Sequence, residues 1–361
     1  MFHICVKYLH IHVIFFSLYS KFRDKYSDNM RVTLKHIADD TGLSIATVSR
    51  ALSRKKRTYS SSEEQIYSSA KKLGYPFFKD PDITQNLPIA LAIKLFEGEF
   101  YAYLLNGFFQ AAFHSNSNIN LQVIKEDVNP VDEIIQLSKN HSGICLFLPS
   151  MTSDDYIKIK EAVGQYPIIS LLPSKSPKID TVCFDSYSGG YMMAKHFQER
   201  GFKKFGYIAG PSTRADAIFR KNGFLDHIHE NDDLELVWNY EGDFSTLSGT
   251  NAFAAFKKSG LKDVAIFGGN DYASFGFLKA ASESGYKIPD DFIIGGFDNV
   301  SFCENSSPEL TSITTDFSEL GKKSIKTIEN IIAENADSIG QISMIPVKII
   351  IRNSSNSTSK P

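Results

Sequence analysis

From residue 88 onward, short apolar runs alternate with amphipathic stretches of helical spacing, and this alternation strongly constrains the fold. It is typical of parallel sheets flanked by helices. Residues 88–352 exceed one comfortable sheet, so we expect two α/β lobes. The predicted strands are Ile89–Phe96, Asn120–Ile124, Gly143–Leu148, Ile168–Leu172, Thr181–Phe184, Phe205–Ala209, Leu234–Tyr240, Val264–Gly268 and Phe292–Phe297.

Residues 30–79 have a different pattern, which predicts a small all-helical head. Gly42 interrupts the first helical stretch and can adopt the left-handed conformation that a sharp turn needs. Ser44 follows as a good N-cap for a second helix. A third helix is predicted to open near Ser60 and to end at Gly74.

Charge is distributed unevenly along the chain. The whole sequence has a formal net charge of −2. Residues 30–79 hold ten Lys or Arg and four Asp or Glu, a formal charge of +6. Residues 1–29 add +2, which leaves −10 for the remainder. A basic head on an acidic body favours an anionic polymer as the partner of the head alone.

The segments outside these two parts carry little pattern. Residues 1–29 contain an apolar run too short to span a bilayer comfortably and lack a cleavage site, so we interpret them as an upstream or disordered extension before Met30. Residues 80–87 are a linker, and the polar tail 353–361 is predicted to be disordered. The four cysteines are widely separated, so we expect buried free thiols, with no metal site and no cofactor.

Four ordered blocks carry a resemblance to a known family. The segment VTLKHIADDTGLSIATVSRAL (Val32–Leu52) resembles the helix-turn-helix of LacI-family regulators, with His36 in place of a common aspartate. The blocks Gly206–Phe224, Ile266–Asn299 and Pro308–Gly321 resemble later family segments. The resemblance implies a periplasmic-binding-protein-like body of two lobes, one of residues 88–183 with 317–342 and the other of residues 184–312 with 343–352.

The resemblance also implies which head residues contact double-stranded DNA. The helix Ser44–Leu52 would enter the major groove, with Ile45 and Ala46 at the specificity positions. Both are apolar and suit thymine methyl groups, although core packing is an alternative for Ile45. Arg50 can reach a base edge or a phosphate. The other predicted DNA-contacting residues are Thr33, Ser44, Thr47, Ser49, Ser53 and Arg57.

The segment behind the head departs from the family pattern. The family usually has a hinge there that folds into a short helix on DNA and inserts a leucine into the minor groove. Thr84 falls where that leucine belongs. Pro81 opposes a helix, and the acidic Asp80 and Asp82 oppose close approach to phosphates. The family's kinked-operator geometry is therefore not expected to carry over directly.

In the body, the resemblance implies a ligand site between the lobes, at the carboxyl ends of strands. Arg220 matches the family's ligand-binding arginine, and Phe244 falls where a ring stacks on the ligand. Arginine, amide and carboxylate groups with aromatic walls suit a neutral polyhydroxyl such as a sugar. Leu172 and Pro173 replace a common aspartate, so a purine stays open. The predicted effector-binding residues are Phe100, Tyr101, Asp216, Arg220, Phe244, Asn270 and Asp298.

Other interpretations of these residues remain open. The three aromatic side chains could be core residues, and Asn270 and Asp298 could be helix caps or turn formers. A solute-binding protein would share the body, but the helical head argues against that class. No catalytic motif was found in a suitable context, so an enzyme is not expected. We expect a cytoplasmic homodimer that binds a pseudo-palindromic operator under control of a small effector, without a membrane partner.

Overall fold

The computed structural model describes residues 32–53, 60–73, 75, 87–94, 98–115, 117–125, 127–334 and 339–356. The chain divides into two compact units, a small N-terminal head and a body that holds nearly all residues after 86. The predicted extension 1–29, the linker before residue 87 and the basic loop with Arg57 lie outside the described residues. Among the described residues, no helix combines the length and apolarity needed to cross a membrane.

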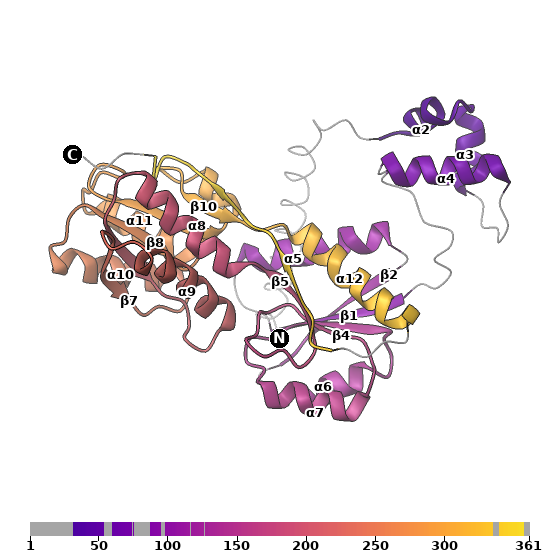
Figure 1. Cartoon of the computed structure of the whole chain (residues 1–361), viewed down its shortest axis with the longest axis horizontal. Helices are drawn as coiled ribbons and strands as arrows, with labels where there is room; N and C mark the ends of the chain where they lie inside the picture. The colour runs from indigo at the N-terminus through magenta and orange to yellow at the C-terminus, as the bar shows by residue number, and fades with distance from the viewer. Residues whose placement is uncertain are drawn as a thin grey trace, which may run out of the picture. The chain divides into compact units, whose positions relative to one another are not determined.

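The head consists of three helices around a small apolar core, as predicted (Figure 1). Gly42 ends the first helix in the left-handed conformation, with φ of 71°. The Tyr67 hydroxyl donates to the Ala51 carbonyl oxygen at 2.7 Å and ties the third helix to the second. The helices are α2 (Leu34–Thr41), α3 (Ile45–Ser53) and α4 (Ser61–Leu73). The core consists of Ile37, Ala38, Val48, Ala51, Ile66 and Ala70.

The first lobe of the body is a six-stranded parallel sheet in the order β11-β5-β4-β3-β1-β2. Helices α5 and α12 cover one face of this sheet, and α6 and α7 cover the other (Figure 1). Alternate side chains of β1 point to opposite faces, because Leu91 packs in the core with α5 and α12 and Ala92 packs in the core with α6 and α7. The strands are β1 (Leu87–Ile93), β2 (Ser117–Val123), β3 (Gly143–Phe147), β4 (Ile168–Ser170), β5 (Asp180–Phe184) and β11 (Ile342–Ile345). The helices are α5 (Glu99–His114), α6 (Pro130–Leu137), α7 (Ser153–Val163) and α12 (Phe317–Glu334).

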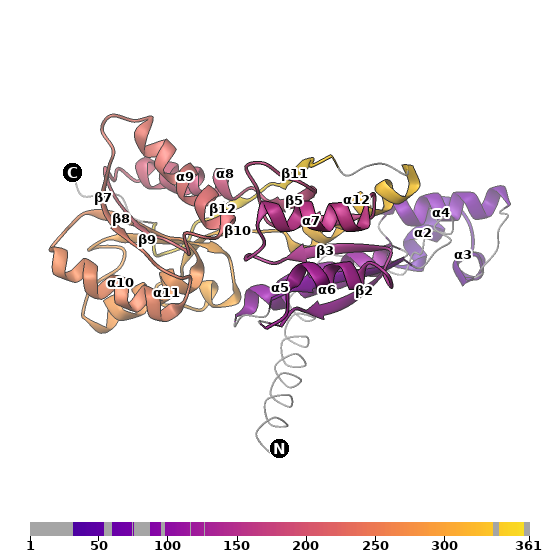
Figure 2. The ribbon, with the colours of Figure 1, turned by 90° about the horizontal axis from the view of Figure 1, so that it is seen from below.

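The second lobe repeats this architecture in the order β12-β10-β9-β8-β6-β7. Its pairings are parallel except that β12 runs antiparallel to β10. Helices α8 and α9 cover one face, and α10 and α11 cover the other (Figure 2). The strands are β6 (Lys204–Ile208), β7 (Glu235–Tyr240), β8 (Val264–Gly268), β9 (Ile293–Asp298), β10 (Thr311–Thr314) and β12 (Lys348–Ile350). The helices are α8 (Ser186–Glu199), α9 (Ala215–His229), α10 (Thr246–Ser259), α11 (Asp271–Glu283) and the short 3₁₀ helix η1 (Ser301–Glu304).

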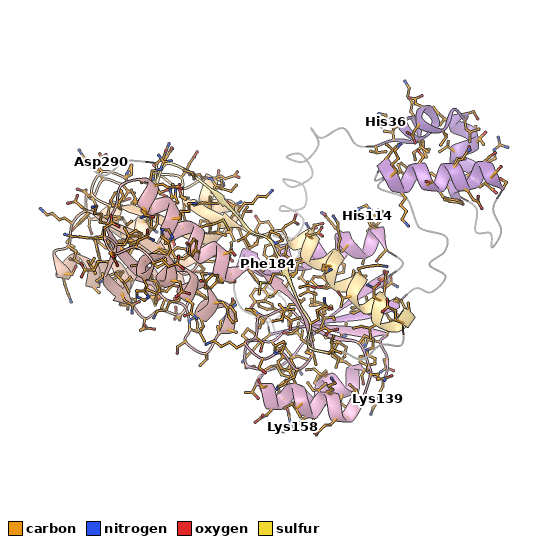
Figure 3. The ribbon with its side chains drawn as sticks, viewed as in Figure 1. His36, His114, Lys139, Lys158, Phe184 and Asp290 are labelled. Atoms are coloured by element: carbon orange, nitrogen blue, oxygen red, sulfur yellow. The ribbon has the colours of Figure 1, made fainter. Side chains whose placement is uncertain are left out.

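The chain passes between the lobes three times, after β5, after β10 and after β11. Phe184, labelled in Figure 3, ends β5 and packs against the cores of both lobes. Because β11 pairs with β5, residues up to Ile345 belong to the first lobe. The predicted change of lobe after residue 342 is therefore wrong by about three residues. The sequence around Gly340 has no pattern that marks where the chain leaves the first lobe.

The C-terminal tail also differs from the prediction. Disorder was predicted from residue 353, but Ser354 and Ser355 are fully buried. The Ser354 Oγ donates to the Ile294 carbonyl oxygen at 2.7 Å, and Ser355 Oγ lies 2.8 Å from His196 Nε2. The prediction was wrong for residues 353–356 because these small hydroxyl side chains satisfy buried backbone and ring atoms, which a polar composition does not indicate.

Helices α8 and α9 cross so closely that glycine is required at the contact. A Cβ atom at Gly190 would lie 2.0 Å from the carbonyl oxygen of Arg220. We therefore expect Gly190→Ala to lower the free energy of unfolding by about 1–3 kcal/mol, although alanine favours helix over glycine. Thermal unfolding should show this loss, whereas Lys195→Ala on the exposed side of α8 should change little. Equal melting temperatures for Gly190→Ala and the parent chain would contradict the close crossing.

Candidate functional site

The N-terminal end of α3 is an exposed surface of the head. Ile45 is 48% exposed, which excludes core packing as its role, and Ala46 is also exposed. Ser44 caps the helix: its Oγ accepts from the Thr47 backbone N–H at 3.1 Å. The cap confirms the predicted helix start. Both predicted specificity residues, Ile45 and Ala46, are therefore exposed in the capped first turn of α3.

The other predicted DNA-contacting residues that the structure describes belong to α3 or to the start of α2. Arg50 is exposed one turn further along α3, and its Nε donates to the Ala46 carbonyl oxygen at 3.4 Å. Thr33 directly precedes α2 and is exposed, and Ser49 is half-buried on α3. Ser53 is the last residue of α3, whereas Arg57 lies outside the described residues.

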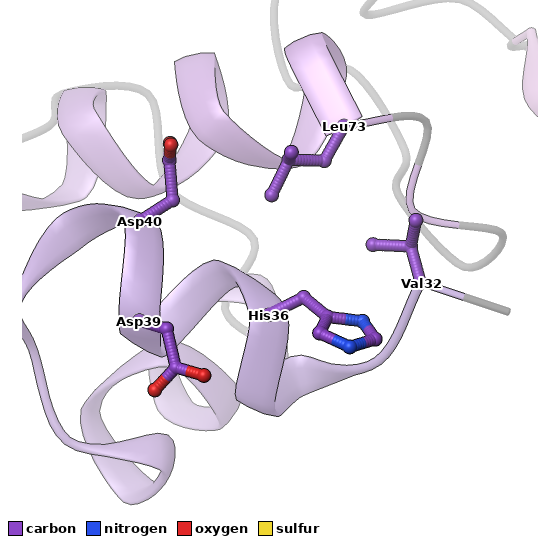
Figure 4. Close-up of a pocket in the computed structure, with 5 residues that line it drawn as sticks. All are labelled: Val32, His36, Asp39, Asp40 and Leu73. Atoms are coloured by element: carbon purple, nitrogen blue, oxygen red, sulfur yellow. The ribbon is translucent and has the colours of Figure 1, made fainter. Parts of the chain in front are cut away.

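A hollow in the head lies between the start of α2 and the end of α4 (Figure 4). Asp40 on its wall accepts hydrogen bonds from Ser69 Oγ at 2.7 Å and from Lys72 Nζ at 3.0 Å. These bonds lower the pKa of Asp40 and tie α2 to α4. Two carboxylates on the wall make this a poor surface for phosphates. The hollow is lined by Val32, His36, Asp39, Asp40 and Leu73.

Arg220 holds a central place among the predicted effector-binding residues of the body. Its side chain is buried on α9, and its guanidinium carbon lies 3.4 Å from the centre of the Phe297 ring. Arg220 Nη1 donates to the carbonyl oxygen of Gly269. Its Nε is buried and has no hydrogen-bond partner among the described residues. A buried donor without a partner is costly, so this atom marks a place where a ligand acceptor would be stabilising.

Asp216 is engaged by a residue that the sequence reasoning missed. Arg214 donates from Nε to Asp216 Oδ1 at 3.0 Å and from Nη2 to Oδ2 at 2.7 Å. Burial raises the pKa of Asp216, but the adjacent Arg214 guanidinium outweighs it and keeps the pKa below the ordinary 3.8. Both carboxylate oxygens are therefore occupied, and Arg214 is the group of this pair that faces the aromatic rings.

Phe244 and Asn270 form one unit. The Asn270 side chain donates from Nδ2 to the Phe244 carbonyl oxygen at 3.0 Å and accepts from the Ala273 N–H at 2.9 Å. Asn270 is thus the N-cap of α11, the alternative that the sequence left open. The Phe244 ring lies 5.1 Å from the Arg214 guanidinium carbon and 5.6 Å from that of Arg220. Asn270 therefore positions a ring that stands beside both arginines.

The first lobe contributes an aromatic cluster. Phe100 and Tyr101 lie in the first turn of α5, and both rings contact Phe147 at the end of β3, with ring centroids 5.2 and 5.8 Å away. The Arg214 guanidinium carbon lies 5.8 Å from the Phe147 centroid, so the cluster meets the second lobe. Burial raises the pKa of Tyr101 to about 12, and Arg214 opposes this rise. The predicted residues from the two lobes are therefore brought together. Arg214 and Phe147 were not among the predicted site residues, because their contacts in the site are with residues distant in the sequence.

Two acids at the end of β9 and the start of α11 have different roles. Asp271 is fully buried, and its carboxylate accepts from Ser312 Oγ at 2.6 Å and from the Val300 N–H at 3.0 Å, so it is structural. Asp298 ends β9 with a positive φ of 107°. Burial raises the pKa of Asp298 to about 7, with Arg220 opposing the rise. Asp298 directly follows Phe297, the residue on whose ring the Arg220 guanidinium stacks.

This shift predicts a pH dependence of stability. The folded chain holds the Asp298 proton more tightly than the unfolded chain, whose carboxyl titrates near 3.8. The resulting stabilisation is complete below about 3.8 and is lost as pH rises through about 7. The Asp298→Asn side chain does not titrate, so the variant does not lose this stabilisation. The melting temperature of the variant minus that of the parent should therefore increase as pH rises from about 3.8 to about 7. A constant difference would contradict the shifted pKa.

Comparisons with known proteins agree with this architecture. A family model described as a periplasmic binding protein-like domain matches residues 194–355. The repressor PurR of Mannheimia succiniciproducens is 24% identical over 89% of this chain and 98% of its own length. The operon regulator NtdR of Bacillus subtilis is 27% identical over 89% of this chain and 99% of its own length.

Solved structures extend the likeness to the fold. The lac repressor dimer bound to operator and an anti-inducer matches 90% of this chain and 99% of its own, with 21% identity and a TM-score of 0.66. A LacI-family regulator from Enterococcus faecalis with bound ribose matches 76% of this chain and 100% of its own, with 26% identity and a TM-score of 0.63.

The body therefore defines a two-lobed, periplasmic-binding-protein-like sensor attached to a helix-turn-helix head. Along nearly its whole length the chain is similar to transcriptional regulators, among them a solved regulator described as a member of the LacI family. These named repressor and regulator relatives support a DNA-binding repressor with a small-molecule effector, and not an enzyme, as the class of this chain. The solute-binding alternative is set aside, because the repressor relatives match nearly the whole chain, the head included.

Proposed function

We propose that the effector binds between the lobes against Arg220 and Asp298 and that it is a neutral polyhydroxyl compound such as a sugar. The buried Arg220 Nε, to which none of the described residues forms a hydrogen bond, carries this proposal. A ligand hydroxyl can accept from Arg220 and donate to the neighbouring Asp298 carboxylate. The rings of Phe100, Phe147 and Phe244 offer apolar faces beside these polar groups. The bound ribose of the E. faecalis regulator and a CelR–cellobiose complex support this class.

A purine is the second candidate, because Leu172 supplies no carboxylate where many family members have one. Leu172 is buried and apolar, and the nearby aromatic rings suit a planar heterocycle as well as a sugar. A thermal-shift screen of the full chain against sugars and nucleobases separates the two. We expect a sugar to raise the melting temperature of the parent chain and not that of Arg220→Ala. If only nucleobases raise the melting temperature of the parent chain, the effector is a purine and not a sugar.

For the head, we propose that Ile45 and Ala46 read base edges and that Arg50 contacts a base or phosphate. Exposure of Ile45 at the capped end of α3 supports this assignment. The hydroxyls of Thr33, Ser44, Thr47, Ser49 and Ser53, together with Arg57, would contact phosphates. Phosphate contacts position the helix, whereas the two apolar side chains confer preference for thymine methyl groups.

We further propose that the protein is a cytoplasmic homodimer on a pseudo-palindromic operator, paired through α5 and β2. Between Glu99 and Lys125 the sequence contains no Asp, Glu, Lys or Arg, although 22% of the whole chain is charged. Phe109, Leu121 and Val123 in this segment are 47%, 38% and 43% exposed. An exposed face without charges on an edge strand is typical of a protein interface.

Charges introduced on this face should therefore separate the subunits. We expect Phe109→Glu with Val123→Glu to give a monomer by light scattering and to weaken operator binding, because two heads no longer bind together. The matched control is Ile157→Glu on α7, where an isoleucine 37% exposed lies outside this face. A double variant that remains dimeric would place the interface elsewhere.

A further inference from the structure

A set of hydrogen bonds joins the two lobes at the start of α5. Glu99 belongs to the first lobe, and Ser301 opens η1 in the second. Ser301 donates from its backbone N–H to Glu99 Oε2 at 2.9 Å and from Oγ to Oε1 at 2.8 Å. Both oxygens of one carboxylate are thus engaged across the lobes, and hydrogen bonds to a charged acceptor are stronger than neutral ones.

Tyr272 adds a second connection at the same place. The Glu99 backbone N–H donates to the Tyr272 hydroxyl oxygen at 2.6 Å. A Cβ atom at Gly98 would lie 3.2 Å from the Tyr272 ring, so the Gly98 backbone packs directly on this ring. The ring is held in turn by Phe302, with centroids 5.1 Å apart. The first turn of α5 is therefore fixed to α11 and η1 by both polar and apolar contacts.

This connection is separate from the three crossover segments. The crossovers leave the first sheet by β5 and β11, which form one edge. Glu99 instead follows β1, which lies beside the opposite edge strand β2. In two-lobed proteins, hinge motions open and close the lobes about the crossover segments. Contacts on the side away from the crossovers are therefore positioned to oppose opening.

We infer that Glu99, Tyr272 and Ser301 form an interlobe clasp that sets the opening of the lobes and positions the Phe100–Tyr101 pair. The pair follows Glu99 directly in the chain, so holding Glu99 holds both rings opposite the second lobe. The inference rests on the proposed effector site between the lobes. In that site the three clasp residues are positioning residues, because they act through the aromatic pair and the lobe geometry.

The test measures the distance between the lobes in the full chain without effector or DNA. Spin labels are attached to cysteines at Lys139 and Asp290, two exposed positions on different lobes (Figure 3), with Cys5 replaced by serine. The three described native cysteines are buried. Double electron–electron resonance should give a longer and broader distance distribution for Glu99→Ala than for the parent chain.

Milder variants guard against misfolding. Tyr272→Phe keeps the ring against Gly98 and removes the hydroxyl, and Ser301→Ala removes one hydrogen-bond donor to Glu99. Each single variant should shift the distance distribution less than Glu99→Ala does, and the Tyr272→Phe/Ser301→Ala double variant should shift it more than either single variant. Glu161→Ala, an exposed acid on α7, should leave it unchanged. Unchanged distributions in Glu99→Ala and in the Tyr272→Phe, Ser301→Ala pair would overturn the clasp. The proposed effector site is tested separately: if neither sugars nor nucleobases raise the melting temperature of the parent chain, that proposal fails while the clasp can still hold.

Discussion

Arg220→Ala is expected to abolish the response of operator binding to effector while leaving effector-free operator binding intact. The substitution removes the buried guanidinium that bonds Gly269 and stacks on Phe297. It also removes the buried Nε that carries the effector proposal, an atom with no hydrogen-bond partner in the part of the chain that the structure describes. Loss of one member of a buried charged contact costs about 2–5 kcal/mol, a weakening of roughly 30-fold or more. Gel-shift titration with the stabilising compound measures the response.

Two further variants make this expectation specific. Arg220→Lys keeps the positive charge but loses the planar fork, so we expect it to recover little of the response. Lys221→Ala changes the neighbouring, partly exposed cation and should respond as the parent does. An Arg220→Ala chain that still responds to the compound at the parent's concentrations would show that the effector binds elsewhere.

Arg50→Ala is expected to weaken operator binding by about 1–3 kcal/mol, which is roughly 5- to 150-fold. Arg50 is exposed on α3, one turn beyond the apolar specificity positions, so its loss should not disturb the core of the head. Gel-shift titration at fixed salt measures the change, since phosphate contacts make the affinity depend on salt. Lys258→Ala, on an exposed part of α10, removes an equal charge as a control.

The outcome distinguishes two roles for Arg50. If Arg50→Ala lowers affinity equally for all DNA sequences and makes affinity depend less steeply on salt concentration, Arg50 contacts a phosphate. If the variant no longer discriminates between bases at one operator position, Arg50 contacts that base pair. Equal affinity of Arg50→Ala and the parent chain would remove Arg50 from the interface.

Much of the fold could be predicted from the sequence because its strands are runs of apolar residues. All nine predicted strands are present. Most of them, such as β3, β8 and β9, are buried between helices and are apolar in consequence, whereas the edge strands β2 and β7 are partly exposed. Strands β10, β11 and β12 were not predicted. They have three or four residues each, and β10 contains Thr311 and Ser312, which are buried through hydrogen bonds that no composition reveals.

The candidate site was predicted in part. Family motifs indicated Arg220, Phe244 and Asp298. The structure brings Arg220 beside the Phe244 ring and stacks it on Phe297, the residue directly before Asp298. The bidentate pairing of Asp216 with Arg214 was missed, because a carboxylate in a predicted site does not indicate whether another side chain already occupies it. The Glu99 clasp was missed for a similar reason: Glu99 and Ser301 lie 202 positions apart in the chain, and only the fold joins them.

The central claim is that effector binding in the body changes operator binding by the head. The most direct measurement selects an operator from randomised duplex DNA with the full chain, then titrates that operator with and without the compound that stabilises the body. The account predicts a site of two inverted half-sites, whose affinity the compound changes by about 5- to 150-fold in either direction. A selected operator whose affinity is the same with and without the compound would contradict it.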